Sequence, residues 1–334
     1  MAANGHDLAG KEISGDETIR RVIAAEARAQ EAQRTVAALR KDRDELLGEF
    51  TDYRNARQPL PPKRVSRKPH RAEMLRVSAG DLHGQRMDRA AVAAFLHDLR
   101  SLDPDEIVLG GDMGECGGWL AKHQPIGYVA ESDYSYQEDM LAANWFLDQV
   151  AEAAPRARVV MLEGNHEDRV ERWCVDQTRA HQRDAEFLRA AFSPATMLRL
   201  EDRGIQYYRR SVEHVPGLPP GWIKLGKMFF AHELGSGKNA ARDAVLKTAG
   251  NVTYFHTHRE DTATVVFPGV GVCKAFCPGC LCVRQPMWRH SDPTSWSHGY
   301  AIDCVAASGL FQRVHVPIWE GESLGAAMIH RLRA

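Results

Sequence analysis

The chain has 334 residues, of which 44% are hydrophobic and 26% are charged, and its formal net charge is −1. A chain of this length can bury a full hydrophobic core, and its composition is that of an ordinary globular protein. The small net charge excludes a general electrostatic attraction to nucleic acid, so any such attraction must come from local patches.

We recognise no membrane-spanning or export signal in the sequence. No stretch approaches the roughly 18 apolar residues that span a bilayer, and the first residues lack the basic start and apolar stretch of a secretory signal. The seven cysteines are an odd number, and four of them crowd between positions 273 and 282. This is not the pattern of a disulfide framework, so we expect a protein of the reducing cytoplasm. The lack of a long apolar stretch adds the expectation that the protein does not contact a membrane.

The N-terminal part predicts a flexible tail over residues 1–16 and a long helix over residues 17–53. Between 17 and 50, apolar residues recur three and four positions apart: Val22, Ala25, Ala29, Ala32, Val36, Leu39, Leu46 and Phe50. This heptad pattern indicates a coiled coil that would join subunits into a homo-oligomer. Because the seam is rich in alanine, a single helix folded against the rest of the chain is the alternative.

Residues 54–72 contain seven arginines and lysines, four prolines and no acidic residue. Such a composition is typical of an extended, solvated linker. The same charges could contact the phosphates of a nucleic acid, which is the less common meaning of a basic run.

From residue 73 to 334 the sequence predicts one α/β domain. Apolar runs predict strands at 74–79, 106–109, 158–162, 227–231 and 251–255, and helical patterns cover 89–102 and 138–153. Alternating strands and helices favour α/β layering. The later runs 262–267, 301–306 and 311–318 have no helices between them and predict a second, more antiparallel sheet.

Each of the first five predicted strands ends in side chains that can bind metal ions. In chain order these are Asp81 and His83, Asp112, Asn165 with His166 beside it, His232, and His256 with His258. Ligands of open α/β sheets bind in the crevice at the carboxyl ends of the strands, so we expect these turns to converge. Alternate residues of an extended segment face the same way, so both Asp81 and His83, and both His256 and His258, can reach one site.

Carboxylate and amide oxygens combined with imidazole nitrogens suit Mn²⁺, Fe or Zn²⁺, whereas Ca²⁺ prefers oxygen alone and structural zinc favours thiolates. The ligands are too numerous for one ion. The sequence therefore predicts two divalent ions about 3.5–4 Å apart.

The order of these motifs, Asp-x-His, Gly-Asp, Gly-Asn-His-Glu, His and His-x-His, resembles that of the calcineurin-like metallophosphoesterases. The resemblance runs from about Met74 to the region after His258. It implies a four-layer sandwich of two mixed β-sheets flanked by helices, here preceded by a helical N-terminal extension. It also implies hydrolysis of a phosphate ester by water that two metal ions activate.

The resemblance also implies a role for each residue. Asp81, His83 and His258 would hold one ion, and Asn165, His232 and His256 would hold the other, with Asp112 bridging the two. His166 resembles the histidine that protonates the leaving oxygen or steadies the phosphate.

The motifs depart from the family at three places. The second motif reads Gly111–Gly117 with Glu115 where protein phosphatases have aspartate followed by arginine. The missing arginine argues against a phosphoprotein phosphatase, and Glu115 is expected to orient His166. Ala231 and Phe255 replace the glycine before a histidine, but the ligands themselves are retained.

Two further groups of residues have two interpretations each. Arg169 and Arg172 could bind a substrate phosphate bidentately or could face solvent. Cysteine and histidine side chains crowd together late in the sequence, and they could hold a structural zinc ion or remain free thiols and ordinary histidines. They are Cys273, Cys277, Cys280, Cys282, His290 and His298.

Aromatic and basic residues alternate after the last ligand motif: Arg284, Trp288, Arg289, His290, Trp296 and Tyr300. This pattern suits base stacking with phosphate contact, and core packing is the alternative. Together with the missing arginine and the basic linker, it favours a phosphodiesterase or nuclease acting on nucleic acid or a nucleotide. A phosphomonoesterase and a non-catalytic assembly subunit are the two other hypotheses.

Overall fold

The computed structural model describes residues 20–27, 30, 34, 73–121, 134–178, 182–286, 293–326 and 328–329. The chain divides into two compact units, Met1–Leu60 and Pro61–Ala334. The described residues of the first unit are helical. The predicted tail (1–16), most of the predicted coiled coil and the basic linker (54–72) lie outside the described residues, so these expectations stay predictions.

The second unit begins with strands that alternate with helices. Its elements in chain order are β1 (Glu73–Ala79), η1 (Gly84–Arg86), α2 (Arg89–Leu102), β2 (Glu106–Leu109), η2 (Gly118–Leu120), α4 (Tyr136–Ala153), β3 (Arg158–Leu162), α5 (Glu167–Gln177), α6 (Gln182–Phe192), α7 (Pro194–Met197), β4 (Gln206–Tyr208), β5 (Ile223–Leu225), β6 (Met228–Ala231), α8 (Ala240–Thr248), β7 (Asn251–Tyr254), β8 (Glu260–Phe267), β9 (Gly271–Pro278), β10 (Gly299–Ala306) and β11 (Phe311–Pro317).

These strands form two sheets, and both are mixed. The first sheet has the order β11-β10-β1-β2-β3-β4. In it β1 to β4 are parallel to one another, and β10 is antiparallel to both of its neighbours, β1 and β11. The second has the order β5-β6-β7-β9-β8, in which β6, β7 and β9 are parallel. The expected fold class of two mixed sheets flanked by helices is confirmed.

One expectation about the sheets is wrong in part. The runs at 301–306 and 311–318 were expected in the second sheet, but β10 pairs antiparallel with β1, with Ile302 opposite Val77, and β11 pairs with β10. The residues of β10 are buried on both faces, so their hydrophobic pattern does not indicate which sheet they join. Only the long-range pairing decides this.

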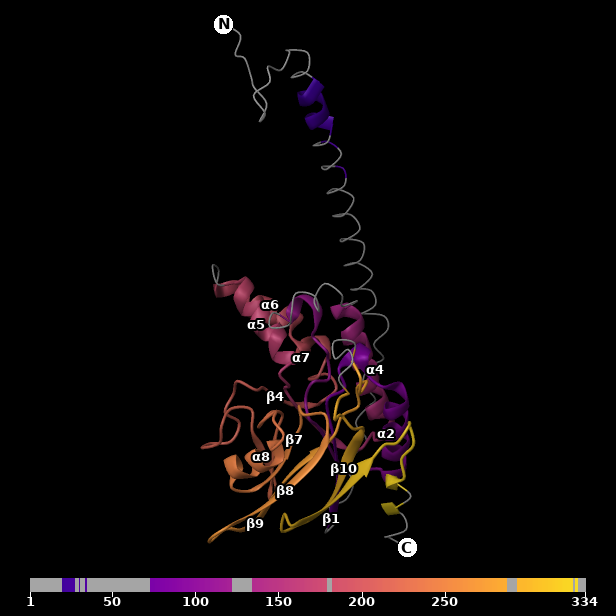
Figure 1. Cartoon of the computed structure of the whole chain (residues 1–334), viewed down its shortest axis with the longest axis vertical. Helices are drawn as coiled ribbons and strands as arrows, with labels where there is room; N and C mark the ends of the chain where they lie inside the picture. The colour runs from indigo at the N-terminus through magenta and orange to yellow at the C-terminus, as the bar shows by residue number, and fades with distance from the viewer. Residues whose placement is uncertain are drawn as a thin grey trace. The chain divides into compact units, whose positions relative to one another are not determined.

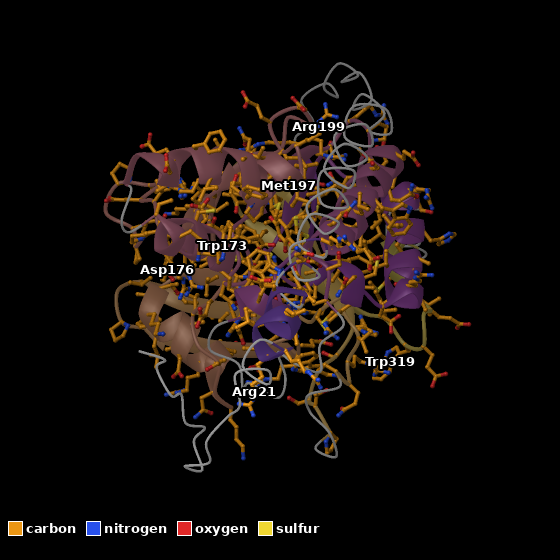
Figure 2. All side chains as sticks on the ribbon, turned by 90° about the horizontal axis from the view of Figure 1, so that it is seen from above. Arg21, Trp173, Asp176, Met197, Arg199 and Trp319 are labelled. Carbon is orange, nitrogen blue, oxygen red and sulfur yellow. The ribbon has the colours of Figure 1, made fainter. Side chains whose placement is uncertain are left out.

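Three hydrophobic cores separate four layers of secondary structure. The first lies between the first sheet and the helices around α2, α4 and α5, the second between the second sheet and α8, and the third between the two sheets. Figure 1 shows α8 beside β7 to β9 of the second sheet, and α2 and α4 on the opposite side of the domain, beside the first sheet. Trp173 and Met197, labelled in Figure 2, pack partly buried against the first core.

Charged side chains also cross the layer between the sheets. Arg313 on β11 donates to both carboxylate oxygens of Asp303 on β10, at 2.7 and 2.6 Å, and its third nitrogen donates to Thr253 on β7 at 2.7 Å. Both members of the ion pair are almost fully buried. The ion pair lies within the first sheet, and the hydrogen bond from Arg313 to Thr253 joins the two sheets. The carboxyl ends of β1 to β3 and of β6 and β7 meet at the candidate site.

No helix within the described ranges is both long enough and apolar enough to cross a bilayer.

Candidate functional site

The loops that follow β1, β2, β3, β6 and β7 meet at one place, and they carry all seven predicted metal ligands. Backbone hydrogen bonds join the loops directly: Asp81 N donates to Gly111 O at 3.0 Å, and His83 N donates to Asp112 O at 2.9 Å. The two sheets are joined in the same way, since His256 N donates to a carboxylate oxygen of Asp81 at 3.0 Å. The convergence therefore follows from the ends of parallel strands in both sheets.

A first group contains Asp81, His83, Asp112 and His258, each offering one ligand atom within 4.8 Å of the others. The Nε2 atoms of His83 and His258 are 3.1 Å apart, and His258 Nε2 lies 3.4 Å from Asp81 Oδ1. All four side chains are buried. This is the set that the resemblance assigns to one ion, with the bridging aspartate.

A second group contains Asp112, His232 and His256. Asn165 joins it, because its Oδ1 lies 3.0 Å from His232 Nε2 and 2.8 Å from His256 Nδ1. His232 Nδ1 donates to Gly110 O at 2.8 Å, which leaves Nε2 directed toward Asp112 and Asn165. Asp112 is thus the member that the two groups share.

Asp112 provides the test of whether metal ions fit here. Its Oδ1 accepts a hydrogen bond from His166 N at 2.9 Å, whereas its buried Oδ2 accepts none. Three imidazole Nε2 atoms face Oδ2, those of His232 at 3.2 Å, His166 at 3.8 Å and His83 at 3.9 Å. A buried carboxylate oxygen without a hydrogen bond is costly unless a cation compensates it. The residues present therefore fit a pair of divalent ions.

The charges of the neighbours keep this carboxylate ionised. Burial opposes ionisation, but the neighbouring imidazoles, His232 foremost, hold the pKa of Asp112 well below its usual range. The reciprocal effect appears at His232, where burial is outweighed by Asp112 and the pKa of the imidazole rises to about 9. Asp112 is thus available as an anionic ligand at neutral pH.

The backbone at the site is strained. Asp81, His83, Asp112, His256 and His258 all adopt positive φ angles, between 52° and 71°. Such a conformation is uncommon for residues other than glycine and clusters at functional sites, where the surroundings enforce it. Half of the described non-glycine residues with positive φ belong to this site.

Close packing explains three glycines and one departure from the family pattern. A Cβ at Gly164 would lie 2.0 Å from Asp112 Oδ1, and one at Gly110 would lie 2.3 Å from the ring of Phe255. The fully buried Phe255 ring also packs beside Gly80. The large residue before His256 is therefore accommodated by two glycines on the first sheet.

Glu115 bonds two histidines, His83 through its carboxylate and the expected His166 through its backbone carbonyl. Its carboxylate accepts a hydrogen bond from His83 Nδ1 at 2.7 Å and lies 3.8 Å from His166 Nδ1, which donates to the backbone carbonyl of Glu115 instead. Although burial opposes it, His83 and His166 lower the pKa of Glu115 to about 2. An ionised carboxylate that holds His83 Nδ1 directs Nε2 into the first group.

His166 lies at the edge of both groups. Arg169 donates to its Nε2 at 2.9 Å and to the carbonyls of Glu115 and Cys116, each at 3.3 Å. Burial lowers the pKa of His166 to about 3, so the imidazole is neutral in this arrangement. Arg172 does not join the site: it pairs with Asp168 one helical turn away and is largely exposed.

Two buried acids that carried no role in the sequence support the ligand loops. Glu167 on α5 accepts hydrogen bonds from four backbone N–H groups, those of Asp112, Met113, Gly114 and Gly164, at 2.7–3.0 Å. In the sequence, only the position of Glu167 at the end of the Gly-Asn-His-Glu motif could have predicted this supporting role.

The second buried acid is Asp139 on α4, which accepts from the backbone N–H groups of Gln85, Glu115 and Cys116 and from the hydroxyl of Tyr134. It belongs to no motif, so sequence reasoning had no signal for it.

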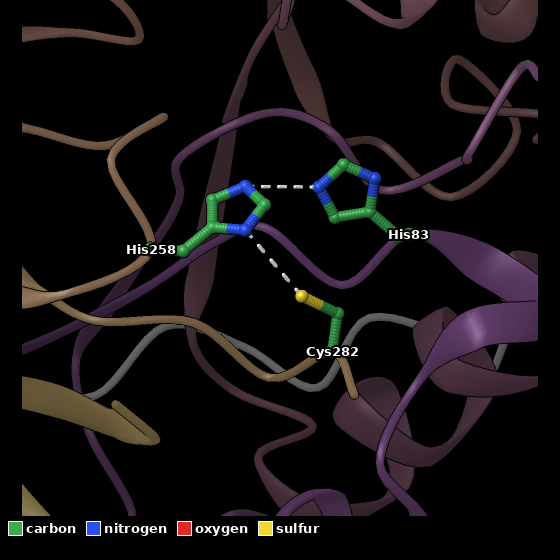
Figure 3. A group of neighbouring side chains, drawn as sticks. All are labelled: His83, His258 and Cys282. Carbon is green, nitrogen blue, oxygen red and sulfur yellow. Dashed lines mark hydrogen bonds between the residues drawn. The ribbon is translucent and has the colours of Figure 1, made fainter. Parts of the chain in front are cut away.

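The four late cysteines do not gather into one metal site. Cys273 and Cys277 belong to the core under α8, and no described group of metal-binding atoms contains more than one of the four thiols. Cys282 lies with His83 and His258 (Figure 3), its Sγ 3.7 Å from His258 Nδ1. His298 bonds the carbonyl of Cys282 at 2.8 Å, and His290 lies outside the described residues.

The aromatic and basic segment divides between core and site. Tyr300 is buried in the first core, where its hydroxyl bonds Asp98, so packing explains it. Trp296 instead lies beside the site with its ring centroid 4.0 Å from that of His258. Trp288 and Arg289 lie outside the described residues.

A pocket of about 600 Å³ opens over the two groups. It is lined by His83, Gln85, Arg86, Asp112, Glu115, Asn165, His166, Arg169, His256, His258, Cys282, Val283, Gln285, Pro286 and Trp296. A small-molecule ligand could therefore reach the shared carboxylate from solvent.

Comparison with known proteins relates this geometry to a family. The sequence model of the family described as calcineurin-like phosphoesterase matches residues 77–277, a span that contains the seven clustered side chains. No curated protein matches the chain.

Solved structures that resemble the chain include YfcE, a phosphoesterase from E. coli, with 17% identity, a TM-score of 0.30 and coverage of 72% of this chain and 99% of that one. A single mutant of Vps29 from Entamoeba histolytica has 12% identity, a TM-score of 0.31 and coverage of 72% and 98%. Vacuolar protein sorting 29 from Cryptosporidium parvum has 9% identity, a TM-score of 0.36 and coverage of 75% and 94%. On the match of the family model over most of the domain, the chain belongs to the calcineurin-like phosphoesterase family.

Proposed function

We propose that this protein hydrolyses phosphodiesters, those of a nucleotide or nucleic acid, with two divalent metal ions. The family membership and the candidate ligand groups support the coarser statement, a metal-dependent phosphoesterase. The observation that carries the proposal is the buried Asp112 Oδ2, which lacks a hydrogen bond and lies where the two groups of ligands meet.

In this proposal Asp81, His83 and His258 hold one ion, Asn165, His232 and His256 hold the other, and Asp112 serves both. Their oxygen and imidazole donors suit Mn²⁺ foremost, with Fe and Zn²⁺ as alternatives. When bound, the two ions activate water as a nucleophile and neutralise charge on the phosphoryl oxygens.

The side chains at the edge of the site would bind the phosphate. Arg169 already lies 2.9 Å from His166 Nε2, so a phosphate that pairs with Arg169 would also contact this imidazole. An anion beside His166 would raise its pKa from the low value that burial imposes. His166 could then donate a proton to the leaving oxygen.

Diester substrates are supported by the size and lining of the pocket. Its volume of about 600 Å³ exceeds the need of a phosphate group, and an apolar side adjoins the polar one. The missing arginine of the second motif also argues against a phosphoprotein substrate.

The test compares bis-p-nitrophenyl phosphate, p-nitrophenyl phosphate and labelled single- and double-stranded DNA, each with Mn²⁺, Zn²⁺ or a chelator. We expect the diester to be hydrolysed faster than the monoester and the chelator to stop turnover. Monoester preference would contradict the diester proposal, and silence with every metal despite metal binding would favour a non-catalytic subunit.

Asp112→Asn tests the carboxylate on which the proposal rests. Turnover should fall by about 10²-fold or more, because charge stabilisation by the ions is worth several kcal/mol, while the protein stays folded by circular dichroism. Asp184→Asn, an exposed residue on α6, is the matched control and should keep the wild-type rate. Wild-type turnover by Asp112→Asn would refute the assignment.

Self-association through residues 17–50 is also part of the proposal, and its basis is the heptad pattern alone. Light scattering of the full chain tests it, and a strictly monomeric protein at high concentration would exclude it.

A further inference from the structure

The pocket over the site has two chemically different sides. Asn165, His166 and Arg169 form a polar side next to the ligand groups. We call the apolar members of the lining the apolar side, and they come from the segment after β9 and the segment before β10. These members are Cys282, Val283, Pro286 and Trp296.

Backbone hydrogen bonds hold this apolar side against the ligand loops. Leu281 N donates to Asp81 O at 3.2 Å, and Val283 N donates to Arg86 O at 2.9 Å. On the other segment, Ser297 N donates to His258 O at 2.8 Å. Both segments are thus attached to residues of the site, so the apolar side is preformed.

Its side chains are poorly suited to a phosphate but suited to the organic part of an ester. Trp296 is half-buried and lines the pocket beside His258, and Val283 remains 42% exposed although it is apolar. An aromatic ring next to a phosphate site binds flat ligand groups by stacking.

We propose that Trp296 and Val283 form a subsite that stacks the nucleobase of a nucleoside phosphate ester. The inference rests on the proposed function and names the substrate class of the same site. Gln85 and Gln285 also line the pocket, and Gln285 Oε1 accepts a hydrogen bond from Thr294 N at 3.2 Å, which holds this amide beside the segment before β10. An alkyl or lipid group would instead place hydrocarbon against these amides and against Arg86, which is unfavourable.

Two probes that differ in the base, AMP and ribose 5-phosphate, test the subsite by calorimetry with the metal-loaded full chain. Wild type should bind AMP at least about fivefold more tightly, which is the low end of stacking on an aromatic side chain. Trp296→Leu should reduce this preference to below about twofold and leave ribose 5-phosphate binding unchanged. Trp296→Phe, which keeps an aromatic face, should restore most of it.

Val283→Asp provides a second test at an exposed position, and it should also reduce the AMP preference. Trp119→Leu changes a half-exposed tryptophan outside the pocket lining and should match wild type. Equal binding of AMP and ribose 5-phosphate by wild type would overturn the inference. An equal loss of affinity for AMP and for ribose 5-phosphate in Trp296→Leu would also overturn the inference, because Trp296 would then act only through His258.

Hydrolysis of methyl p-nitrophenyl phosphate, which has no base, separates the two levels of the proposal. Hydrolysis without an AMP preference would reject the subsite alone, whereas an AMP preference without hydrolysis would reject the catalytic proposal alone.

Comparing AMP with a short single-stranded oligoadenylate identifies the source of the base. Tighter oligonucleotide binding indicates a nucleic acid and equal binding a free nucleotide, and both results support stacking.

Discussion

Asp112 and Glu115 show how single side chains divide the work at the site. Asp112 lies between the two ligand groups with one carboxylate oxygen bonded to the backbone and one directed at imidazoles. The carboxylate of Glu115, three residues later, does not lie between the two groups but accepts a hydrogen bond from His83 Nδ1, the ring nitrogen on the far side from the first group. A carboxylate behind a histidine ligand fixes the ring orientation and raises its basicity.

Glu115→Gln tests this supporting role. The amide oxygen can still accept from His83 Nδ1, but the negative charge is lost, so we expect metal affinity or turnover to fall about 10–100-fold. Metal titration followed by thermal melting measures the affinity directly. Glu201→Gln, an exposed glutamate, serves as the control, and an unchanged affinity in Glu115→Gln would contradict the role.

At the scale of elements, the site depends on loops that follow strands rather than on the strands themselves. The ligand loops have strained backbones, and buried carboxylates from two helices hold them in place. Glu167 at the start of α5 accepts from the loops after β2 and β3, and Asp139 on α4 accepts from the loop after β2 and from η1. The helices therefore position the ligands as well as cover the sheet.

Asp139→Asn should destabilise the protein and impair the site together. One of its oxygens accepts from Gln85 N and Glu115 N, and the other accepts from Cys116 N and the hydroxyl of Tyr134. An amide can replace only one of these acceptors, and buried donors without partners cost about 1–3 kcal/mol each.

We expect the free energy of unfolding of Asp139→Asn to fall by about 2–3 kcal/mol in urea, and the metal affinity to fall with it. Glu138→Gln, the exposed neighbour on the same helix, should change stability by less than about 0.5 kcal/mol. Equal stability of the two variants would refute the supporting role of Asp139.

At the scale of the domain, the hydrophobic core between the sheets adjoins a small group of charged and titratable side chains. Arg313 and Asp303 form a buried pair there, and His315 on the same strand packs against Phe276 of the second sheet, with ring centroids 5.7 Å apart. Burial, reinforced by the charge of Arg313, lowers the pKa of His315 to about 4. The neighbouring acids are Asp303 and Glu260, the latter with an oxygen 3.9 Å from Nδ1.

This interface predicts an acid-sensitive stability. The pKa of His315 is lower in the folded state than the ordinary value of about 6.5, so between these values the unfolded state binds more protons. The free energy of unfolding should therefore decrease as the pH falls from about 7 to 4, on the order of 2 kcal/mol from this residue.

In His315→Gln this part of the decrease should disappear, as measured by urea unfolding at several pH values. His97→Gln, an exposed histidine on α2, should follow the wild-type pH dependence. If His315→Gln retained the full wild-type decrease, the source of acid sensitivity would lie elsewhere.

The sequence by itself determined the fold class and the chemistry available at the site. Strands such as β2 and β3 and the helix α2 were predicted at their observed bounds, because their hydrophobic periods and flanking turns are local properties. The type and order of the polar residues at the strand ends likewise indicated two metal ions, since ligand chemistry depends on residue type.

Only the tertiary structure decided the return of β10 and β11 to the first sheet, the bonding of Glu115 to His83, and the roles of Glu167, Asp139 and Trp296. Each of these depends on contacts between residues far apart in the chain, such as Asp139 with Gln85 or Ile302 with Val77. Local pattern and propensity contain no information about such pairs, because the free energy that selects them arises from packing and hydrogen bonding in the complete fold.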